Sequence, residues 1–225
     1  HGQYGHCKIR FEPCDEEFVF DEEVVGGAVP KSYFPAVEKG LRESLVKGPL
    51  AGYPVTGVKA VLYDGSYHEV DSSEAAFKAA AAIAFREGLK NAKPVLLEPY
   101  YRFSLTVPAE HVGRVMTDLA AMGADCGAPE TQGACVRLSG RGPVAALMDY
   151  PAALRALTHG EGEISLLPDG YAPCRDPAPA VQAAAYDPGA DTDNPAGSVF
   201  CSHGAGYFVP WDEADALMHL PVEQP

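Results

Sequence analysis

The sequence predicts an α+β protein made of two compact units followed by a C-terminal tail. Segments in which apolar residues alternate, as in strands, are interspersed with segments of helical periodicity. This succession occurs twice, over residues 1–96 and again over residues 97–174. From Arg175 onward the composition shifts to Pro, Ala, Asp and Gly, which is typical of a linker. We therefore expect units at 1–96 and 97–174 and a tail at 175–225.

Three strands are expected in the first unit. Two lie between Tyr4 and Val25 and are separated by an acidic turn at Asp15–Glu17. The third is expected over Val55 to Tyr63. Asp64-Gly65 follows it and predicts a tight turn, because this dipeptide favours the backbone conformations that hairpins need.

Two helices are expected in the same unit. The first starts near Pro30 and ends at Gly48-Pro49, and four apolar residues mark one face of it at every fourth position: Tyr33, Val37, Leu41 and Leu45. The second is expected over Ser72 to Asn91, with Asp71 as its N-cap. Glu74, three residues after Asp71, completes a capping-box pattern.

The second unit follows a recognisable order of elements. We expect a strand at Tyr101–Val107, a helix from Pro108, short strands at Ala124–Gly127 and Ala134–Ser139 around a polar turn at Glu130–Gly133, a helix at Met148–Thr158 and a strand at Glu163–Leu167. This order is that of a ferredoxin-like α/β sandwich. Many unrelated activities occur on that architecture, so the order alone predicts no function.

The tail combines a polar and an apolar part. Residues 175–197 are expected to be an extended linker, whereas apolar character returns at Ser198–Phe208 and Trp211–Leu220. We therefore expect the tail to dock, with apolar side chains buried against a neighbouring domain: Trp211, Leu217 and Met218.

Charge and hydropathy exclude several classes of protein. A net charge of −14 argues against nucleic-acid binding through bulk attraction to phosphate. Half of that charge, −7, lies in residues 175–225, which hold one Arg and eight Asp or Glu. The first unit is nearly balanced and starts with basic residues (His6, Lys8, Arg10), so RNA contact is expected there. No apolar run reaches the length of about 20 residues that spans a bilayer, and we expect a cytoplasmic protein without membrane contact.

Sequence motifs give no sign of catalysis. Neither a Gly-x4-Gly-Lys-Ser/Thr loop nor a Gly-x-Gly-x-x-Gly turn is present, so nucleotide hydrolysis by this chain is not expected. The six cysteines lack the paired spacing of zinc sites, so no metal is expected. Cys201 and His203 lie in a glycine-rich segment that could serve a thiol or metal enzyme, but a docking turn is the preferred interpretation.

The segment Tyr63–Val70 admits two interpretations. Tyr67 offers a flat ring and His68 a hydrogen-bond donor and acceptor, which suit unstacked RNA bases. On residue types alone, an exposed hairpin with a solvated histidine is favoured.

Longer sequence segments favour the interpretation as an RNA-contacting loop. Gly2–His6, Gly26–Lys31, Leu50–Val55 and Tyr63–Glu74 closely resemble domain IV of elongation factor G. Lys93–Pro99 resembles the junction into domain V of that family. The resemblance implies a ribosomal protein S5 domain 2-like fold for 1–96, with an opening strand missing, and a ferredoxin-like domain V for 97–174.

The resemblance also implies a function and its site residues. In that family of translational GTPases, domain IV enters the A site of the small ribosomal subunit, where it contacts tRNA and mRNA during translocation. Domain V lies near the stalk base and sarcin–ricin region of the large one. By motif match, two tip loops are expected to contact RNA, one with Gln3, Tyr4, Gly5 and His6 and the other with Ser66, Tyr67 and His68. GTP and Mg²⁺ would belong to an N-terminal GTPase domain outside this chain, so the chain itself is expected to bind the ribosome and no catalytic residue is expected.

One alternative within the superfamily remains open. Leu97–Tyr101 and Tyr171–Cys174 look closer to the tetracycline-resistance ribosomal protection branch, and the tail around Phe200–Gly206 is not part of standard elongation factor G. A ribosomal protection protein that displaces tetracycline is therefore the second hypothesis. The loop at His68 keeps a translocase-like sequence, which favours a translocation factor.

Overall fold

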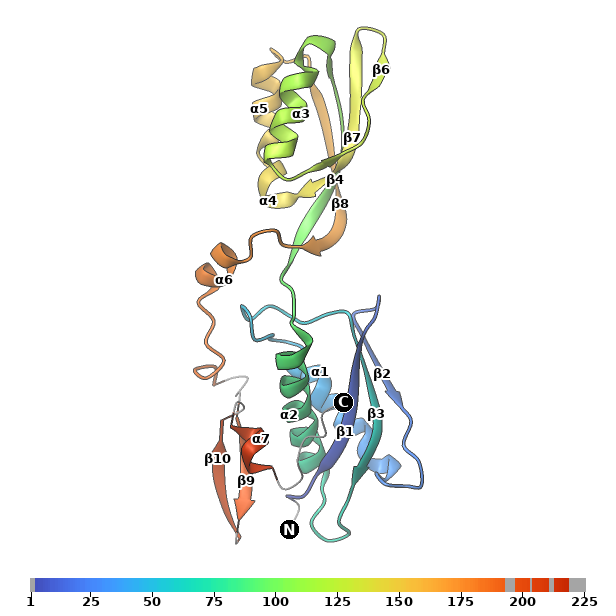
Figure 1. The fold of residues 1–225 in the computed structure, drawn as a ribbon, viewed down its shortest axis with the longest axis vertical. Helices are drawn as coiled ribbons and strands as arrows, with labels where there is room; N and C mark the ends of the chain where they lie inside the picture. Colours follow the sequence, from blue (N-terminus) through green and yellow to red (C-terminus); the bar gives the residue numbers. More distant parts are fainter. Residues whose placement is uncertain (1–2, 193–196, 203, 211–212, 219–225) are drawn as a thin grey trace. The chain divides into compact units, whose positions relative to one another are not determined.

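The computed structural model describes residues 3–192, 197–202, 204–210 and 213–218. The chain divides into two compact units, shown in Figure 1. The first unit comprises residues 1–94 together with 176–225, and the second comprises residues 95–175. The C-terminal tail thus belongs to the first unit.

A three-stranded sheet forms one layer of the first unit. Its strands are β1 (His6–Pro13), β2 (Phe18–Glu22) and β3 (Val58–Ser66), in the order β1-β3-β2. Strand β1 is antiparallel to β3, whereas β2 is parallel to it. The two strands expected before Val25 and the acidic turn between them are confirmed.

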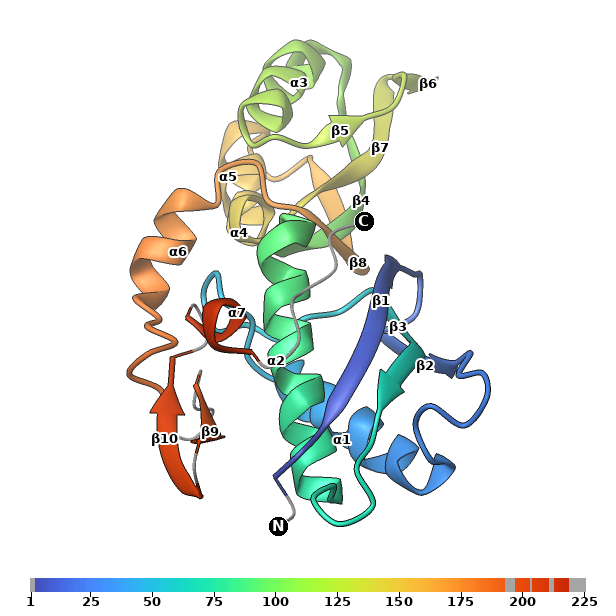
Figure 2. The ribbon, with the colours of Figure 1, turned by 60° about the horizontal axis from the view of Figure 1, so that its bottom comes forward.

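Two helices cover one face of this sheet (Figures 1 and 2). The first, α1 (Phe34–Ser44), follows a short 3₁₀ helix, η1 (Lys31–Tyr33), and the second is α2 (Glu74–Ala92). The helices bury large side chains against the sheet: Val37, Leu41, Phe77 and Phe85. Tyr33 stacks on Phe77 with ring centroids 4.5 Å apart, so the periodicity correctly predicted the buried face of α1.

The turn expected at Asp64-Gly65 is wrong, because β3 continues to Ser66. Gly65 is paired with Cys7 of β1. A Cβ at Gly65 would lie 2.4 Å from the carbonyl oxygen of His6 and 2.6 Å from the Val29 side chain. The glycine is therefore required by close packing inside the sheet, and not by a turn.

The cap expected for α2 is also wrong by two residues. Ser73 is the N-cap, and its side chain accepts a hydrogen bond from the amide of Ala76 at 3.1 Å. The extended backbone of Ser73 places its hydroxyl over the first turn, which is the geometry of an N-cap. Asp71 instead offers its carbonyl to the amide of Tyr4 at 2.8 Å.

The second unit is a ferredoxin-like sandwich, as predicted. Its elements are β4 (Leu97–Pro108), η2 (Ala109–His111), α3 (Val112–Ala121), β5 (Asp125–Cys126), β6 (Glu130–Gln132), β7 (Cys135–Pro143), α4 (Val144–Leu147), α5 (Tyr150–Leu157) and β8 (Glu163–Pro173). The antiparallel sheet has the order β5-β7-β4-β8, and β6 pairs with β7. Helices α3 and α5 cover one face and leave the other face open (Figure 1).

The sequence missed three details of this unit. The polar turn expected at Glu130–Gly133 contains strand β6. The last strand extends past Leu167 to Pro173. The helix expected over Met148–Thr158 is α5, but a short helix, α4, precedes it and was not expected.

The tail contains α6 (Ala178–Ala184), the hairpin β9 (Ser198–Ser202) and β10 (Ala205–Val209), and α7 (Ala214–Leu217). Helix α6 lies where the composition predicted an extended linker. Val209 and Ala214 are buried, whereas Leu217 is 46% exposed in this chain, so its burial against a further domain stays a prediction. Met218 is half-buried, and Trp211 lies outside the described residues. Within the described ranges, no helix is both long and apolar enough to cross a membrane.

Candidate nucleic-acid interface

Residues from two distant segments meet at one end of the first sheet. His6, the first residue of β1, is the register partner of Ser66, the last residue of β3. The Tyr4 hydroxyl lies 2.7 Å from Ser66 Oγ, and His6 Nδ1 lies 2.9 Å from the same oxygen. Three of the residues expected to contact RNA are thus held in one hydrogen-bonded group.

The first segment is also fastened to helix α2. A Cβ at Gly5 would lie 2.6 Å from the backbone carbonyl of Ala76, so only glycine allows the chain to pass this close to the helix. Tyr4 forms an isolated parallel bridge with Ser72, the residue before the N-cap of α2. Gln3, just before this anchor, is exposed. Tyr4 and Gly5 are therefore positioned by α2 as well as by the sheet.

The second tip loop is closed by two hydrogen bonds between His68 and Ser72. The amide of His68 donates to Ser72 Oγ at 2.9 Å, and the amide of Ser72 donates to the His68 carbonyl at 3.0 Å. Tyr67, one residue earlier, is 43% exposed. The loop is thus held in a defined conformation while it presents an aromatic ring to solvent.

Hydrogen bonds fix the orientation of the His68 ring. The amides of Val70 and Asp71 donate to His68 Nδ1 at 3.4 and 3.2 Å. Because Nδ1 accepts, this pattern assigns the proton of the neutral ring to Nε2. The side chain is 58% exposed, so Nε2–H is an accessible donor. An oxygen of the Asp71 carboxylate also lies 3.3 Å from Nδ1.

One ion pair lies beside this end of the sheet. Lys8 Nζ lies 3.4 Å from the Asp64 carboxylate. A hydrogen bond from the Gly65 amide and, more weakly, the Lys8 charge lower the pKa of Asp64 below its ordinary value. This carboxylate is therefore ionised and paired at neutral pH, which limits the repulsion it would exert on a phosphate.

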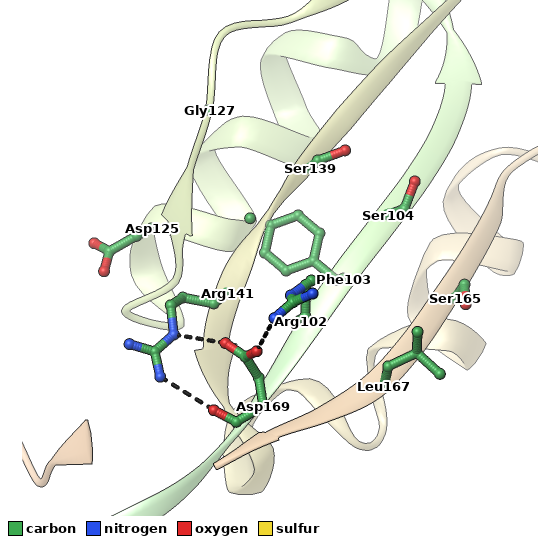
Figure 3. A pocket seen from close by; sticks show the side chains of 11 residues that line it. Arg102, Phe103, Ser104, Asp125, Gly127, Ser139, Arg141, Ser165, Leu167 and Asp169 are labelled. Carbon is green, nitrogen blue, oxygen red and sulfur yellow. Dashed lines mark hydrogen bonds and ion pairs between the residues drawn. The ribbon is translucent and has the colours of Figure 1, made fainter. Parts of the chain in front are cut away.

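The open face of the second sheet carries a separate polar surface (Figure 3). Ser104 on β4 is opposite Ser139 on β7 and Ser165 on β8, so three exposed hydroxyls cross the sheet in one row. The row borders a shallow cavity of about 500 Å³ lined by these serines and by charged side chains: Arg102, Asp125, Arg141 and Asp169.

Asp169 holds two arginines at the edge of this cavity (Figure 3). The guanidinium of Arg102 pairs with one carboxylate oxygen, and Arg141 Nε lies 3.0 Å from the other. Arg141 also donates to the Asp169 carbonyl at 3.3 Å and lies over the Tyr100 ring, 4.8 Å from its centroid. Two positive groups thus share one carboxylate and keep a fixed orientation.

Sequence reasoning did not identify this arginine cluster. Its members come from β4, β7 and β8, and only the register of the sheet brings them together. The available signal was the alternation in β4, where the exposed Arg102 and Ser104 alternate with the buried Phe103 and Leu105.

The Cys201–His203 hypothesis has no structural support from the described residues. Cys201 is exposed on β9, and His203 lies outside the described residues. Across the described ranges, no group of three or more His, Cys, Asp or Glu side chains is arranged to hold a metal ion.

Comparison with known proteins gives two family matches in sequence order. Residues 1–93 match the family model "Elongation factor G, domain IV", and residues 95–181 match "Elongation factor G C-terminus". The residues of the two tip loops lie in the first match, and the arginine cluster lies in the second. Residues 182–225 lie beyond both.

Individual relatives agree with the family matches. The chain is 46% identical to elongation factor G of Thermotoga neapolitana over 163 residues, which is 71% of this chain and 24% of the relative. It is 44% identical to elongation factor G of Fervidobacterium nodosum over 172 residues, 76% of this chain and 25% of the relative. An elongation factor G-like protein of Thermotoga maritima is 42% identical over 169 residues, 74% of this chain and 25% of the relative.

A solved structure agrees as well. A crystal structure of a Thermus thermophilus protein matches with a TM-score of 0.70 and 42% identity, covering 82% of this chain and 28% of that chain. The chain spans about a quarter of the length of the curated relatives it matches. Two adjoining family matches and relatives above 40% identity lead to one conclusion: this chain belongs to the elongation factor G family and corresponds to its domain IV and C-terminal regions.

Proposed function

We propose that this chain is the ribosome-binding part of an elongation factor G-like translation factor. The end of the first unit that carries Tyr67 and His68 enters the A site of the small ribosomal subunit, where it promotes movement of tRNA and mRNA. The observation that carries the proposal is the meeting of Tyr4, His6 and Ser66 beside this closed loop. GTP hydrolysis belongs to an N-terminal domain of the parent protein, which holds GTP and Mg²⁺, and this chain contributes binding.

The chemistry of the tip suits recognition and steric gating. The exposed Tyr67 ring stacks on an unstacked base, and His68 Nε2–H donates to a phosphate or a base edge. Since the loop is closed before binding, little conformational entropy is lost on contact. The tip blocks backward movement by occupying space, and no proton transfer by His68 is involved.

The open face of the second unit provides another RNA contact, on the large ribosomal subunit. Arg102 and Arg141 present planar guanidinium groups that match phosphate oxygens. The serine row supplies hydroxyl donors of the kind that bind nucleic-acid backbones. Asp169 can accept a hydrogen bond from a ribose 2′-hydroxyl, a group that marks RNA. A mixed site of this kind fits a ribose–phosphate backbone better than a bare phosphate ion.

The test is the translocation rate of the full-length parent with His68→Asn. Asparagine keeps an acceptor for the loop amides and removes the imidazole Nε2–H, so the loop stays closed while the contact is lost. We expect the rate to fall by roughly 10-fold, the size of one lost stacking or charged contact. His159→Asn is the matched control, because Asn tolerates the left-handed backbone of His159 (φ 52°). Equal rates for the two variants would disprove the role of the loop.

Two assays of the full-length parent distinguish a translocation factor from a ribosomal protection protein. A translocation factor supports polypeptide synthesis on purified ribosomes. A protection protein raises tetracycline tolerance without supporting synthesis.

A further inference from the structure

Helix α2 is buried on more than one side. Phe77 and Phe85 face the sheet and lie in the core of the first unit. Glu87, on another side of the helix, is only 8% exposed, and burial lowers the pKa of its neighbour Arg86. The sheet and α1 both pack against α2. Figures 1 and 2 both place α7 of the tail beside α2.

A polar cluster joins the tail to the body of the first unit. Asp191 of the tail accepts Lys47 Nζ at 2.6 Å and the Tyr186 hydroxyl at 3.1 Å on the same carboxylate oxygen. Its side chain is 7% exposed, so this carboxylate is almost fully removed from water. Such a carboxylate is tolerated because both partners are in place, and removal of one leaves a buried charge unpaired.

The tyrosine in this cluster also lies directly on the backbone. A Cβ at Gly52 would come within 2.9 Å of the Tyr186 ring, and Gly52 has a left-handed backbone (φ 72°). Lys47 Nζ lies 6.0 Å from the centroid of the same ring. Glycine at position 52 therefore leaves room for the Tyr186 ring, which a side chain there would displace. The packed ring fixes the tail at one position.

We propose that Lys47, Tyr186 and Asp191 form a clip that fastens the tail to the first unit, and that the fastened tail positions α2 and thereby the tip loops. In this proposal α2 carries the effect to the tip, because it begins at the Ser73 cap and its first turn meets Gly5. Tyr186 and Asp191 lie beyond residue 181, where the second family match ends. The inference rests on the proposed function only for what the positioned tip does.

A cluster of this kind differs from an ordinary surface ion pair. Exposed pairs contribute little, because water and salt screen them. Here the carboxylate is buried and receives a second hydrogen bond, so it selects one docking position of the tail. The sequence separation of 144 between Lys47 and Asp191 makes the clip a long-range contact.

The test is hydrogen exchange on the intact chain, measured by mass spectrometry, with Asp191→Asn. We expect amide exchange in 178–192, in α2 and in loop 66–72 to rise by about 10-fold or more, because the tail and the helix open together. Asp176→Asn is the matched control, since Asp176 is an exposed acid of the same tail. Unchanged exchange of 178–192 in Asp191→Asn would refute the clip. Faster exchange of 178–192 alone, with α2 and the loop unchanged, would refute the positioning of the tip.

Two further variants guard against general unfolding. Tyr186→Phe removes one hydroxyl and leaves the charged pair, so it should produce a smaller increase in the same three segments. The double variant Lys47→Met, Asp191→Leu leaves no unpaired charge and should exchange more slowly than Asp191→Leu alone. A double variant that exchanges as fast as Asp191→Leu would contradict pairing. Since no ribosome takes part, these results do not depend on whether the proposed function is correct.

Discussion

The tip of the first unit and the open face of the second unit are both polar surfaces, but they are organised by different forces. At the tip, backbone amides and hydroxyls hold the His68 ring and leave a tyrosine exposed. On the open face, a carboxylate holds Arg102 and Arg141. Under the proposed function, the two surfaces would contact RNA in different ways: stacking and shape at the tip, charge at the sheet. Neither way depends on the net charge of −14 of the whole chain.

The largest expected effect comes from a core substitution that destabilises one unit, and with it only one of the two surfaces. Phe77 is fully buried and stacks on Tyr33, so Phe77→Ala should destabilise the first unit by about 3–5 kcal/mol. Calorimetry should show one transition shifted downward and a second one unchanged. Leu138→Ala, in the core of the second unit, should shift the other transition. A single transition that moves equally in both variants would show that the units do not unfold separately.

Crowding at Gly5 should distort the tip without touching the open face. Gly5→Ala places a methyl group against the Ala76 carbonyl, which should cost about 1–3 kcal/mol in urea unfolding. Gly113→Ala is the matched control, because Gly113 lies in α3 with no heavy atom near its missing Cβ. That control should be neutral or gain up to about 1 kcal/mol from higher helix propensity.

Salt should distinguish the two modes of recognition directly. Tyr67→Ala should weaken ribosome binding by roughly 10-fold at every salt concentration, because stacking does not displace counterions. Arg102→Gln should weaken binding and reduce the slope of log K against log salt by about 1, since one phosphate contact is lost. The measurement is a binding titration at several KCl concentrations. A change of slope with Tyr67→Ala would contradict the distinction.

The smallest effect concerns helix ends in each unit. Lys93 ends α2 and His159 follows α5, and both have left-handed backbones (φ 51° and 52°). Glycine adopts this conformation without strain, so Lys93→Gly and His159→Gly should each stabilise the protein by about 1 kcal/mol. Thermal unfolding should show a gain in a different unit for each. A loss of stability in either variant would mean that the side chain outweighs the backbone strain.

Local patterns predicted elements well and long-range contacts poorly. The periodicity of Val37 and Leu41 identified a buried helix face, and the order of elements in the second unit identified its fold. The same local rules misplaced the cap at Asp71 and made Gly65 a turn residue, because sheet pairing and helix packing decide both positions.

The candidate sites depend on contacts between residues that are even farther apart in the sequence. The tip residues were found through strings shared with a known family, and not through their geometry. The arginine cluster joins strands whose register no local pattern reveals, and the clip joins Lys47 to Asp191 across 144 residues. In α6, a Pro- and Ala-rich stretch forms a helix within the docked tail, where composition alone predicted an extended chain.

Photo-crosslinking of the full-length parent on ribosomes tests the central claim most directly. A photoreactive amino acid would replace Tyr67 at the tip or Ser104 on the open face, one site at a time. The account predicts crosslinks from position 67 to small-subunit RNA, tRNA or mRNA, and from position 104 to large-subunit RNA. Crosslinks from position 67 to large-subunit components alone, or no RNA crosslink from it while position 104 reacts, would contradict the account.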